Sequence, residues 1–369
     1  MQRMLLRHWF CAGHVSSIPL SGDYLTVDLG IESVIIVRTP AGKVRALLNV
    51  CRHRGSRLVA ARCGKALSAR LTCPYHAWTY DLDGNLLAAR QMPEAFRRTD
   101  AALKSLPVRI MQGLVFTTFA KEPLDLEPAA DALAASAGVH GWSTAKVAHR
   151  EMYSIKANWK LAVENYMECY HCTPAHPEFA KRHVYARPAE QAVHLERAGR
   201  TRAEALGIAV PDIDQYGCAA GGRESVAVMR SALHDGMASA TDDGRAVARL
   251  MGAFSASDGN STYFDIGPIS DFLAYPDHGV IYRFIPRSVD HTEMEVLWLV
   301  HEDAVEGLDY DVGRLTWLWK TTSAEDKKIV EMNQAGVNSR YFEPGPYSLQ
   351  ETYAARFVDW YLRELSQPA

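Results

Sequence analysis

Two short cysteine–histidine motifs constrain this chain more than any other feature of its sequence. One residue separates Cys51 from His53, and after nineteen intervening residues Cys73 is followed, two residues on, by His76. Two thiolates and two imidazoles suit a [2Fe–2S] cluster in which histidines replace two cysteines on one iron. Structural zinc, for which Cys2His2 ligation is common, is the alternative. Trp78 lies in a strand-and-hairpin setting rather than a finger helix, which favours the cluster.

The length and charge of the chain indicate an ordinary globular protein. It has 369 residues, enough for two domains, with 48% hydrophobic and 22% charged residues. A net charge of -3 offers no broad attraction to nucleic acid or to an anionic membrane. We see neither a signal peptide nor an apolar run of about 20 residues that would span a bilayer. We therefore expect a soluble cytoplasmic protein.

The seven cysteines point to metal ligation rather than to a disulfide framework. The number is odd, the chain is long, and it carries no export signal. Cys63 lies between the two motifs, and we take it as a non-ligand.

The pattern along the chain predicts an all-β part followed by an α+β part. Strands are expected at 24–27, 33–37, 44–50 and 114–119, and a hairpin at 77–87 turns on Asp83-Gly84. A linking helix and loop should follow at 121–140. Further strands are expected at 150–157, 261–265, 280–286 and 292–300, the last two paired. The stretch 185–260 reads only as a lid or irregular insertion.

Helices complete the second part. We expect them at 158–172, 308–321, 324–333 and 350–365, where aromatic residues of the last one keep helical spacing. Strands followed by helices predict an antiparallel sheet with helices on one side. The domain boundary is expected near residue 122, giving domains 1–122 and 123–369.

A second set of metal-ligand residues lies between 164 and 177. If the helix ran through this stretch, Glu164, Glu168 and His171 would share one face, and Pro174 would end it. His176 would then return toward His171. Two histidines and one carboxylate on one side of a metal form the facial triad of non-haem Fe(II) oxygenases.

The third ligand must come from elsewhere in the chain. Asp326 is the best candidate, because on a helix it shares an inward face with Ile329, Val330 and Asn333. Glu325 and Glu331 remain alternatives on the same segment. Taken alone, a histidine could simply be hydrogen-bonded in the core or on the surface, and a carboxylate near a helix start could simply stabilise the helix dipole. Two metal-ligand patterns in one chain favour metal binding instead.

Residues 51–58 and 73–78 resemble the two cluster-binding loops of Rieske non-haem iron oxygenases, and 158–177 resembles their catalytic iron motif. Two minor departures are a slightly longer interval between the loops and Ala77 where Gly is usual. The family usually has an extra N-terminal segment before Arg7-His8-Trp9-Phe10, so we expect the start to be short or truncated. Glu168, where most of the family has Asp, and the segment 341–348 are similar to the subgroup acting on quaternary ammonium compounds.

This resemblance implies a fold, cofactors and residue roles. It implies an N-terminal Rieske domain and a helix-grip catalytic domain. Cys51, His53, Cys73 and His76 would hold the [2Fe–2S] cluster, and His171, His176 and Asp326 would hold mononuclear Fe(II). Glu168 would bridge the cluster ligand of one subunit and the iron site of the next in a homotrimer. A flavin- or ferredoxin-type NAD(P)H-dependent reductase would supply electrons.

The expected activity is hydroxylation of a C–H bond with O2, at an N-methyl group of a small quaternary ammonium compound. Six aromatic residues are candidates for a cation-binding cage: Tyr166, Phe254, Tyr263, Phe264, Tyr282 and Trp298. Core packing is the better explanation for each of them, so we name no substrate-binding residue. An aromatic-ring dioxygenase is the first alternative. A Rieske electron carrier or zinc-stabilised binding protein is another, but it leaves 150–369 unexplained.

Overall fold

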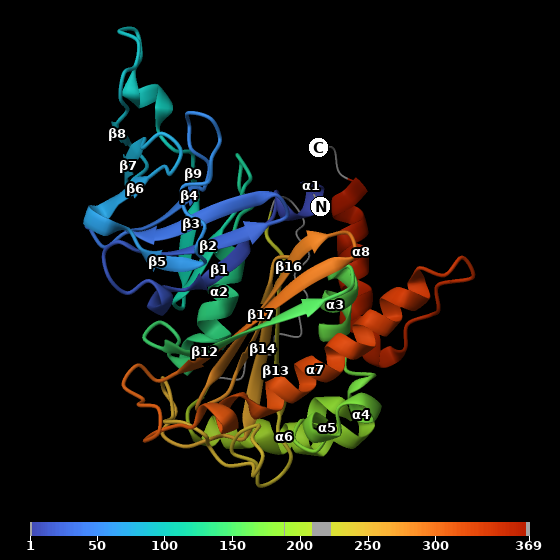
Figure 1. Cartoon of the computed structure of the whole chain (residues 1–369). Coiled ribbons are helices and arrows are strands. Elements are labelled where there is room, and N and C mark those ends of the chain that lie inside the picture. The colour runs from blue at the N-terminus through green and yellow to red at the C-terminus, as the bar shows by residue number, and fades with distance from the viewer. Residues whose placement is uncertain (1, 188, 209–222, 367–369) are drawn as a thin grey trace.

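The computed structural model describes all residues except 1, 188, 209–222 and 367–369. Figure 1 shows two parts: small sheets formed by the first third of the chain, and a large sheet flanked by helices formed by the rest. The fold confirms the predicted order of an all-β part followed by a mixed helix-and-sheet part.

The first part contains three antiparallel sheets. Their strand orders are β1-β11-β10, β5-β2-β3-β4-β9 and β6-β7-β8. Their bounds are β1 Phe10–His14, β2 Asp23–Leu29, β3 Glu32–Arg38, β4 Val44–Leu48, β5 Cys63–Lys65, β6 Arg70–Thr72, β7 Thr79–Asp81, β8 Leu86–Ala88, β9 Ser105–Leu106, β10 Val108–Met111 and β11 Leu114–Thr117. The predicted strands and the hairpin at Asp83-Gly84 are confirmed.

The second part is built on one six-stranded antiparallel sheet, ordered β12-β17-β16-β15-β14-β13. The strands are β12 Lys146–Ile155, β13 Val226–Ala232, β14 Asn260–Ile266, β15 Ser270–Ala274, β16 Gly279–Ser288 and β17 His291–Val300. Ser288 pairs with His291, so β16 and β17 form the predicted hairpin. Strands β13 and β15 were not predicted.

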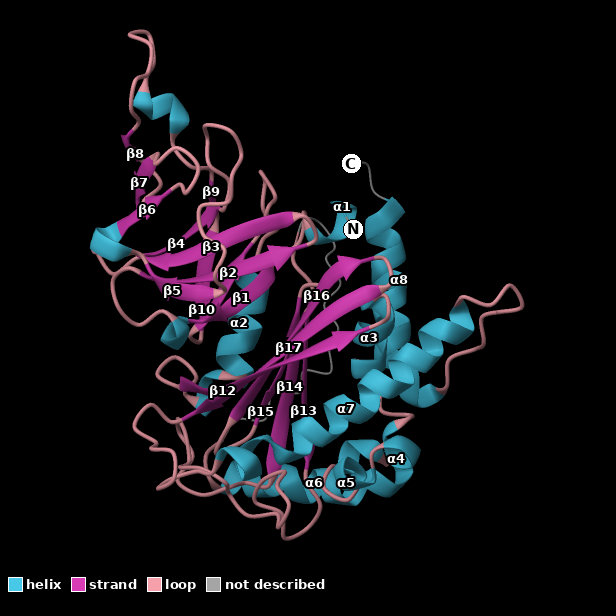
Figure 2. Ribbon diagram, in the orientation of Figure 1, coloured by secondary structure: helices cyan, strands magenta, loops and turns pink. Residues whose placement is uncertain are grey.

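The helices are α1 Gln2–Leu5, α2 Glu127–Ser136, α3 Trp159–Tyr166, α4 Cys172–Ala175, α5 Pro177–Ala180, α6 Ala189–Ala205, α7 Val312–Val337 and α8 Thr352–Ser366. Figure 2 shows α3, α7 and α8 on one side of the large sheet, with α2 on the other. One apolar core joins the sheet to α3, α7 and α8, with Trp298, Trp319 and Phe357 among its members. A second core joins the opposite face to α2 through residues such as Leu133 and Phe272.

The structure corrects two predicted helix boundaries. The two helices expected at 308–321 and 324–333 are one helix, α7. Asp311 caps it by accepting from the Arg314 N–H at 2.9 Å. The predicted break failed because the Thr321 and Thr322 hydroxyls donate to carbonyls four residues earlier, at 2.8 and 2.9 Å, and so are satisfied within the helix.

The helix expected at 158–172 ends instead at Tyr166. The Glu168 carboxylate accepts hydrogen bonds from the backbone N–H groups of Tyr170 and His171. A side chain that captures these N–H groups offers the backbone an alternative to the helix. Pro174 does not end the first helix: it lies in α4, in a first turn where a missing N–H is tolerated.

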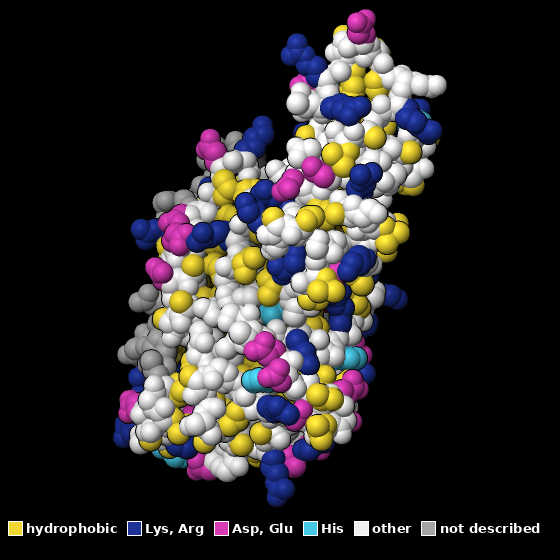
Figure 3. All heavy atoms as spheres, turned by 90° about the vertical axis from the view of Figure 1, so that its left-hand side faces the viewer, with side chains coloured by type: hydrophobic (Ala, Val, Ile, Leu, Met, Phe, Trp, Pro, Cys, Tyr) yellow, Lys and Arg dark blue, Asp and Glu magenta, His cyan; other side chains and the backbone are white. Residues whose placement is uncertain are grey.

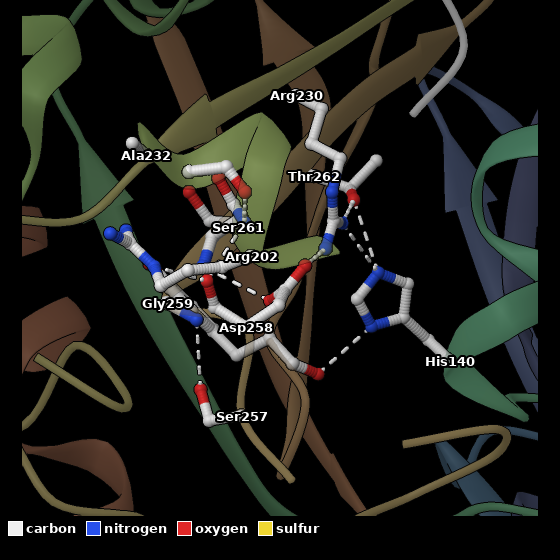
Figure 4. Close-up of polar contacts among 12 residues, drawn as sticks. His140, Arg202, Arg230, Ala232, Ser257, Asp258, Gly259, Ser261 and Thr262 are labelled. Atoms are coloured by element: carbon white, nitrogen blue, oxygen red, sulfur yellow. Dashed lines mark hydrogen bonds and ion pairs between the residues drawn. The ribbon is translucent and has the colours of Figure 1, made fainter. Parts of the chain in front are cut away.

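The stretch 185–260 also differs from the prediction, because it contains α6 and the edge strand β13 rather than only irregular chain. A buried polar network holds the end of β13 against the loop before β14 (Figure 4). Arg230 pairs with Asp258, with side chains 4% and 0% exposed. The Nε2 atom of His140 is 3.0 Å from the Thr262 hydroxyl oxygen. On the other side of the ring, His140 Nδ1 donates to the Tyr275 carbonyl at 3.0 Å. This network fixes two strands that line the cavity described below.

Among the described residues no helix is long and apolar enough to cross a membrane. On the face in Figure 3, Lys and Arg side chains are interspersed with Asp, Glu and hydrophobic side chains.

Candidate functional site

The two cysteine–histidine motifs fold into matching loops. In the first, the Cys51 N–H donates to the Ser56 carbonyl at 2.8 Å, and the Gly55 N–H donates to the Cys51 carbonyl at 3.0 Å. In the second, Cys73 and Trp78 are joined in the same way at 2.8 Å, and the Ala77 N–H donates to the Cys73 carbonyl at 3.0 Å.

Gly55 and Ala77 both have positive φ, +77° and +57°. The family's usual glycine at the second position therefore corresponds to a backbone requirement that Ala77 meets under strain.

The loops bring the predicted cluster residues together. The Nδ1 atoms of His53 and His76 lie 3.2 Å apart, and Trp78 stacks on His53 at 4.8 Å between ring centroids. A separation of this order fits two nitrogen ligands, each about 2 Å from one metal. Cys51 and Cys73 are buried, at 2% exposure each.

Tyr80 supports the first cysteine. Its hydroxyl accepts from the Arg52 N–H at 3.1 Å, which leaves its proton directed to the Cys51 sulfur at 3.5 Å. Burial, followed by the contact with Cys51, raises the pKa of Tyr80, so the hydroxyl keeps this proton.

The distances among the ligand atoms of the four cluster residues argue against a single zinc ion. Four ligands of one tetrahedral ion lie close to one another, since each is about 2.0–2.3 Å from the metal. In the part of the chain that the structure describes, only His171, His176 and Asp326 form a group of three or more His, Cys, Asp or Glu side chains with ligand atoms within 4.8 Å of one another. The four cluster residues do not converge in this way, which fits two irons rather than one ion.

The candidate iron site forms where the chain turns between α3 and α5 against α7. His171 precedes α4, and His176, 1% exposed, precedes α5. Asp326 comes from the inward stripe of α7 that also carries Trp319 and Thr322. The predicted inward position of Asp326 is confirmed.

The three side chains converge on one point. Asp326 Oδ1 lies 3.4 Å from His171 Nε2 and 2.8 Å from His176 Nε2. The two rings are nearly perpendicular, with centroids 5.0 Å apart. Two Nε2 atoms and a carboxylate oxygen at these distances fit one metal ion with open positions on the far side.

A carboxylate also holds the other nitrogen of each histidine. His171 Nδ1 contacts Glu168 Oε1, and His176 Nδ1 lies 2.7 Å from Glu325 Oε2. Such outer carboxylates fix the ring orientation and raise the basicity of a metal ligand. Glu325, an alternative ligand by sequence, therefore lies behind His176 rather than beside Asp326. Glu331 points elsewhere, accepting from the Lys156 N–H at 2.9 Å.

The charges of the metal-free site follow from these contacts. Burial lowers the pKa of His171, but hydrogen bonds to Asp326 and Glu168 outweigh it and raise that pKa to about 9. The pKa of His176 is raised in the same way, against burial, by Asp326 and Glu325. Burial raises the pKa of Asp326, and the two histidines reverse this and lower it. A metal ion would replace protons on a site already arranged around positive charge.

The site opens into a cavity of about 780 Å³, solvent at its mouth included. His171, His176, Asp326 and Glu168 lie in its wall, and aromatic side chains make up much of the rest: Tyr166, Phe179, Tyr185, Tyr263, Phe264, Phe272, Trp319 and Tyr353. Of the six cage candidates, Tyr166, Tyr263 and Phe264 line the cavity, whereas Phe254, Tyr282 and Trp298 are not among its lining residues. Sequence spacing alone did not identify Phe179, Tyr185 or Trp319.

The prediction about cysteines needs one correction. Cys169 and Cys172 form a disulfide, with Cα atoms 4.8 Å apart. Cys169 lies in the turn after α3, and Cys172 begins α4. Both line the cavity. Cys63 is exposed on β5, outside the two cluster loops.

Comparison with known proteins places the chain in a family. Residues 142–367 match the model of the ring hydroxylating alpha subunit (catalytic domain), and residues 8–107 match that of the Rieske [2Fe-2S] domain. The chain belongs to the Rieske oxygenase family, as an oxygenase component with a Rieske [2Fe–2S] cluster and a mononuclear iron. A zinc-stabilised binding protein or a simple electron carrier is excluded, because the catalytic domain accounts for the second part of the chain.

Its relatives are oxygenase subunits of multicomponent systems. The glycine betaine monooxygenase oxygenase subunit of Pseudomonas aeruginosa (strain UCBPP-PA14) is 38% identical, covering 98% of this chain and 84% of the relative. The carnitine monooxygenase oxygenase subunit of Escherichia coli (strain K12) is 37% identical over 48% of each chain.

Solved structures are similar over nearly the whole chain. The quaternary ammonium Rieske monooxygenase CntA with an inhibitor has a TM-score of 0.71 at 25% identity, over 98% of this chain and 90% of its own. Naphthalene 1,2-dioxygenase with indole has a TM-score of 0.70 at 21% identity, over 99% and 88%, which shows the shared fold alone.

Proposed function

We propose that this protein oxidises an N-methyl group of a small quaternary ammonium compound, releasing formaldehyde. The observation that carries the proposal is the group of His171, His176 and Asp326 opening onto an aromatic-walled cavity. A permanent cation without N–H groups is held well by aromatic faces. Relatives named for glycine betaine and carnitine support this substrate class.

The proposed ligand set is the one that the loops and turns bring together. Cys51, Cys73, His53 and His76 hold the cluster, and His171, His176 and Asp326 hold the iron. The iron supplies the oxidising chemistry, and the protein supplies placement and electrostatics. We also propose a domain boundary near residue 122, between the two matched regions.

The overall reaction balances with two electrons from NAD(P)H. One O2, two electrons and two protons convert N–CH3 to N–CH2OH and water. The C–N bond of this product then breaks, giving formaldehyde, a tertiary amine and a proton. The cavity walls keep the N-methyl group at the iron side, and Glu168 and Glu325 keep both histidine ligands oriented.

We propose a homotrimer served by a flavin- or ferredoxin-type reductase. In Figure 1 the sheet β6-β7-β8, which carries the second cluster loop, lies at the upper left, and α3, α4 and α7 lie at the lower right. This arrangement within one chain favours electron transfer between neighbouring subunits. Glu168 would then bridge His76 of the partner subunit and His171.

The test is oxygen consumption by the iron-loaded protein with a reductase and a panel of betaines and aromatic acids. We expect consumption to depend on an N-methyl quaternary compound and to yield one formaldehyde per O2. A cis-diol from an arene, without formaldehyde, would instead establish ring dioxygenation.

A further inference from the structure

Two aspartates with no assigned role lie side by side in the cavity. Asp265 on β14 and Asp271 on β15 are direct cross-strand partners. Both line the cavity that holds the iron-site residues. Across the sheet, Ala227 pairs with Asp265 and Tyr282 pairs with Asp271, so neither neighbour supplies a positive charge.

Nothing in the described protein neutralises this pair. Asp271 is 2% exposed, and its Oδ2 atom is buried without a hydrogen-bond partner. Neither carboxylate forms an ion pair with a described residue. The cavity wall contains four carboxyl groups but no Lys or Arg among the described residues.

This arrangement is unfavourable for the folded protein alone. Like charges directly opposite on adjacent strands destabilise a sheet, and a buried carboxylate without a partner is costly. Burial raises the pKa of both carboxyl groups, and Asp265 adds to the effect on Asp271. Of the four described carboxyl groups in the cavity wall, Glu168 and Asp326 already contact the histidines, which leaves Asp265 and Asp271 to act on a bound molecule.

We propose that Asp265 and Asp271 provide the counter-charge for the substrate's cationic head and so determine its specificity. The proposal rests on the proposed function and refines it. The cavity would recognise the positive charge of the quaternary ammonium group as well as its shape. Among the described residues, the cavity wall has no Lys or Arg to pair with a substrate carboxylate. Removing the positive charge from a ligand should therefore weaken binding far more than removing a carboxylate.

Binding to the iron-loaded, oxygen-free protein tests this with matched ligands. Choline and 3,3-dimethylbutan-1-ol differ by a carbon in place of the charged nitrogen, whereas choline and glycine betaine differ in the carboxylate. We expect choline to bind about tenfold or more tighter than its neutral analogue. Choline and glycine betaine should differ by less than about threefold, since the described cavity wall contains no Lys or Arg to pair with a carboxylate.

Asp271→Asn and Asp265→Asn remove charge while keeping shape. Each should reduce the preference of choline over the neutral analogue to about threefold or less, and should not lower the melting temperature, because Asn has the shape of the protonated carboxyl group that burial favours. Asp131→Asn, an exposed charge on α2, is the control and should change neither. A role in packing alone predicts lower stability and an unchanged preference.

An unchanged ligand preference in both aspartate variants would overturn the proposal, as would a neutral analogue that binds the natural protein as well as choline does. The proposed function fails separately, if no N-methyl compound yields formaldehyde while the aspartates still control cation binding. Normal demethylation efficiency in both variants would preserve the proposed function and refute the role of the aspartates.

Discussion

Replacing Glu325 by Gln tests whether this carboxylate lies behind a metal ligand. Glu325 Oε2 is 2.7 Å from His176 Nδ1, while His176 Nε2 faces Asp326 at 2.8 Å. The His176 side chain is 1% exposed, so its Nδ1–H has no access to solvent as an alternative partner. Losing an outer partner of a metal-bound histidine typically weakens metal binding about 10–100-fold.

The expected loss lies near the lower end of that range. A buried hydrogen bond to a charged group contributes about 1.5–3 kcal/mol, but the Glu325 side chain is 35% exposed and solvent competes. Gln keeps an acceptor oxygen and loses only the charge. We therefore expect iron affinity to fall about tenfold, which corresponds to about 1.4 kcal/mol.

Competition with an Fe(II) chelator under anaerobic conditions measures this affinity, and the visible spectrum of the Rieske cluster should not change. Glu331→Gln, on the same helix but contacting Lys156, is the matched control. Asp326→Asn should lose iron far more completely. If Glu325→Gln lost iron as fully as Asp326→Asn, Glu325 would be a direct ligand; an unaltered affinity would also refute the reasoning.

Four further changes have expected outcomes. Glu168→Gln should retain both metals, measured as iron and acid-labile sulfide, while coupled turnover falls about 10–100-fold; near-normal turnover would argue against the bridge. Asp258→Ala leaves the buried Arg230 unpaired and should lower the free energy of unfolding by about 3–5 kcal/mol in denaturant titration, and a change below 1 kcal/mol would contradict that. Ala77→Gly relieves a positive φ and should raise the unfolding free energy by about 1 kcal/mol or less, whereas a loss would mean that the methyl group packs favourably. Burial raises the pKa of Asp265 to about 8, so choline affinity should rise about tenfold per pH unit below pH 8, since binding a cation releases a proton; a flat profile would count against this.

Residue spacing predicted the parts of the site that depend on local sequence. The cluster loops are tight turns with ligands at fixed offsets, and Asp326 follows from the helical period of α7. Glu168 and His171 were expected on a continuous helix, and that was wrong. A side chain that caps its own following backbone ends α3 early, and this competition depends on geometry that the residue types alone do not reveal.

The pair formed by Asp265 and Asp271 could not be predicted from the sequence for a different reason. Asp265 reads as an ordinary polar residue in an alternating strand, and Asp271 lies in β15, a short strand buried along its whole length. Such a strand has no alternation to recognise. The two carboxyl groups become neighbours only through the register of β14 on β15. Long-range pairing of this kind is set by the whole sheet and not by either segment.

The proposed bridge has a stereochemical requirement that can be counted from this chain. A carboxylate offers about four lone-pair positions. Within its own subunit, Glu168 Oε2 accepts from the Tyr170 and His171 N–H groups, and Oε1 contacts His171 Nδ1. One position therefore remains, on Oε1, for the imidazole of His76 of the partner subunit. If that bond forms, one oxygen atom contacts both a cluster ligand and an iron ligand. A change in protonation or charge at either metal centre then acts on the other through a single shared acceptor, and a side chain that loses this oxygen loses both contacts together.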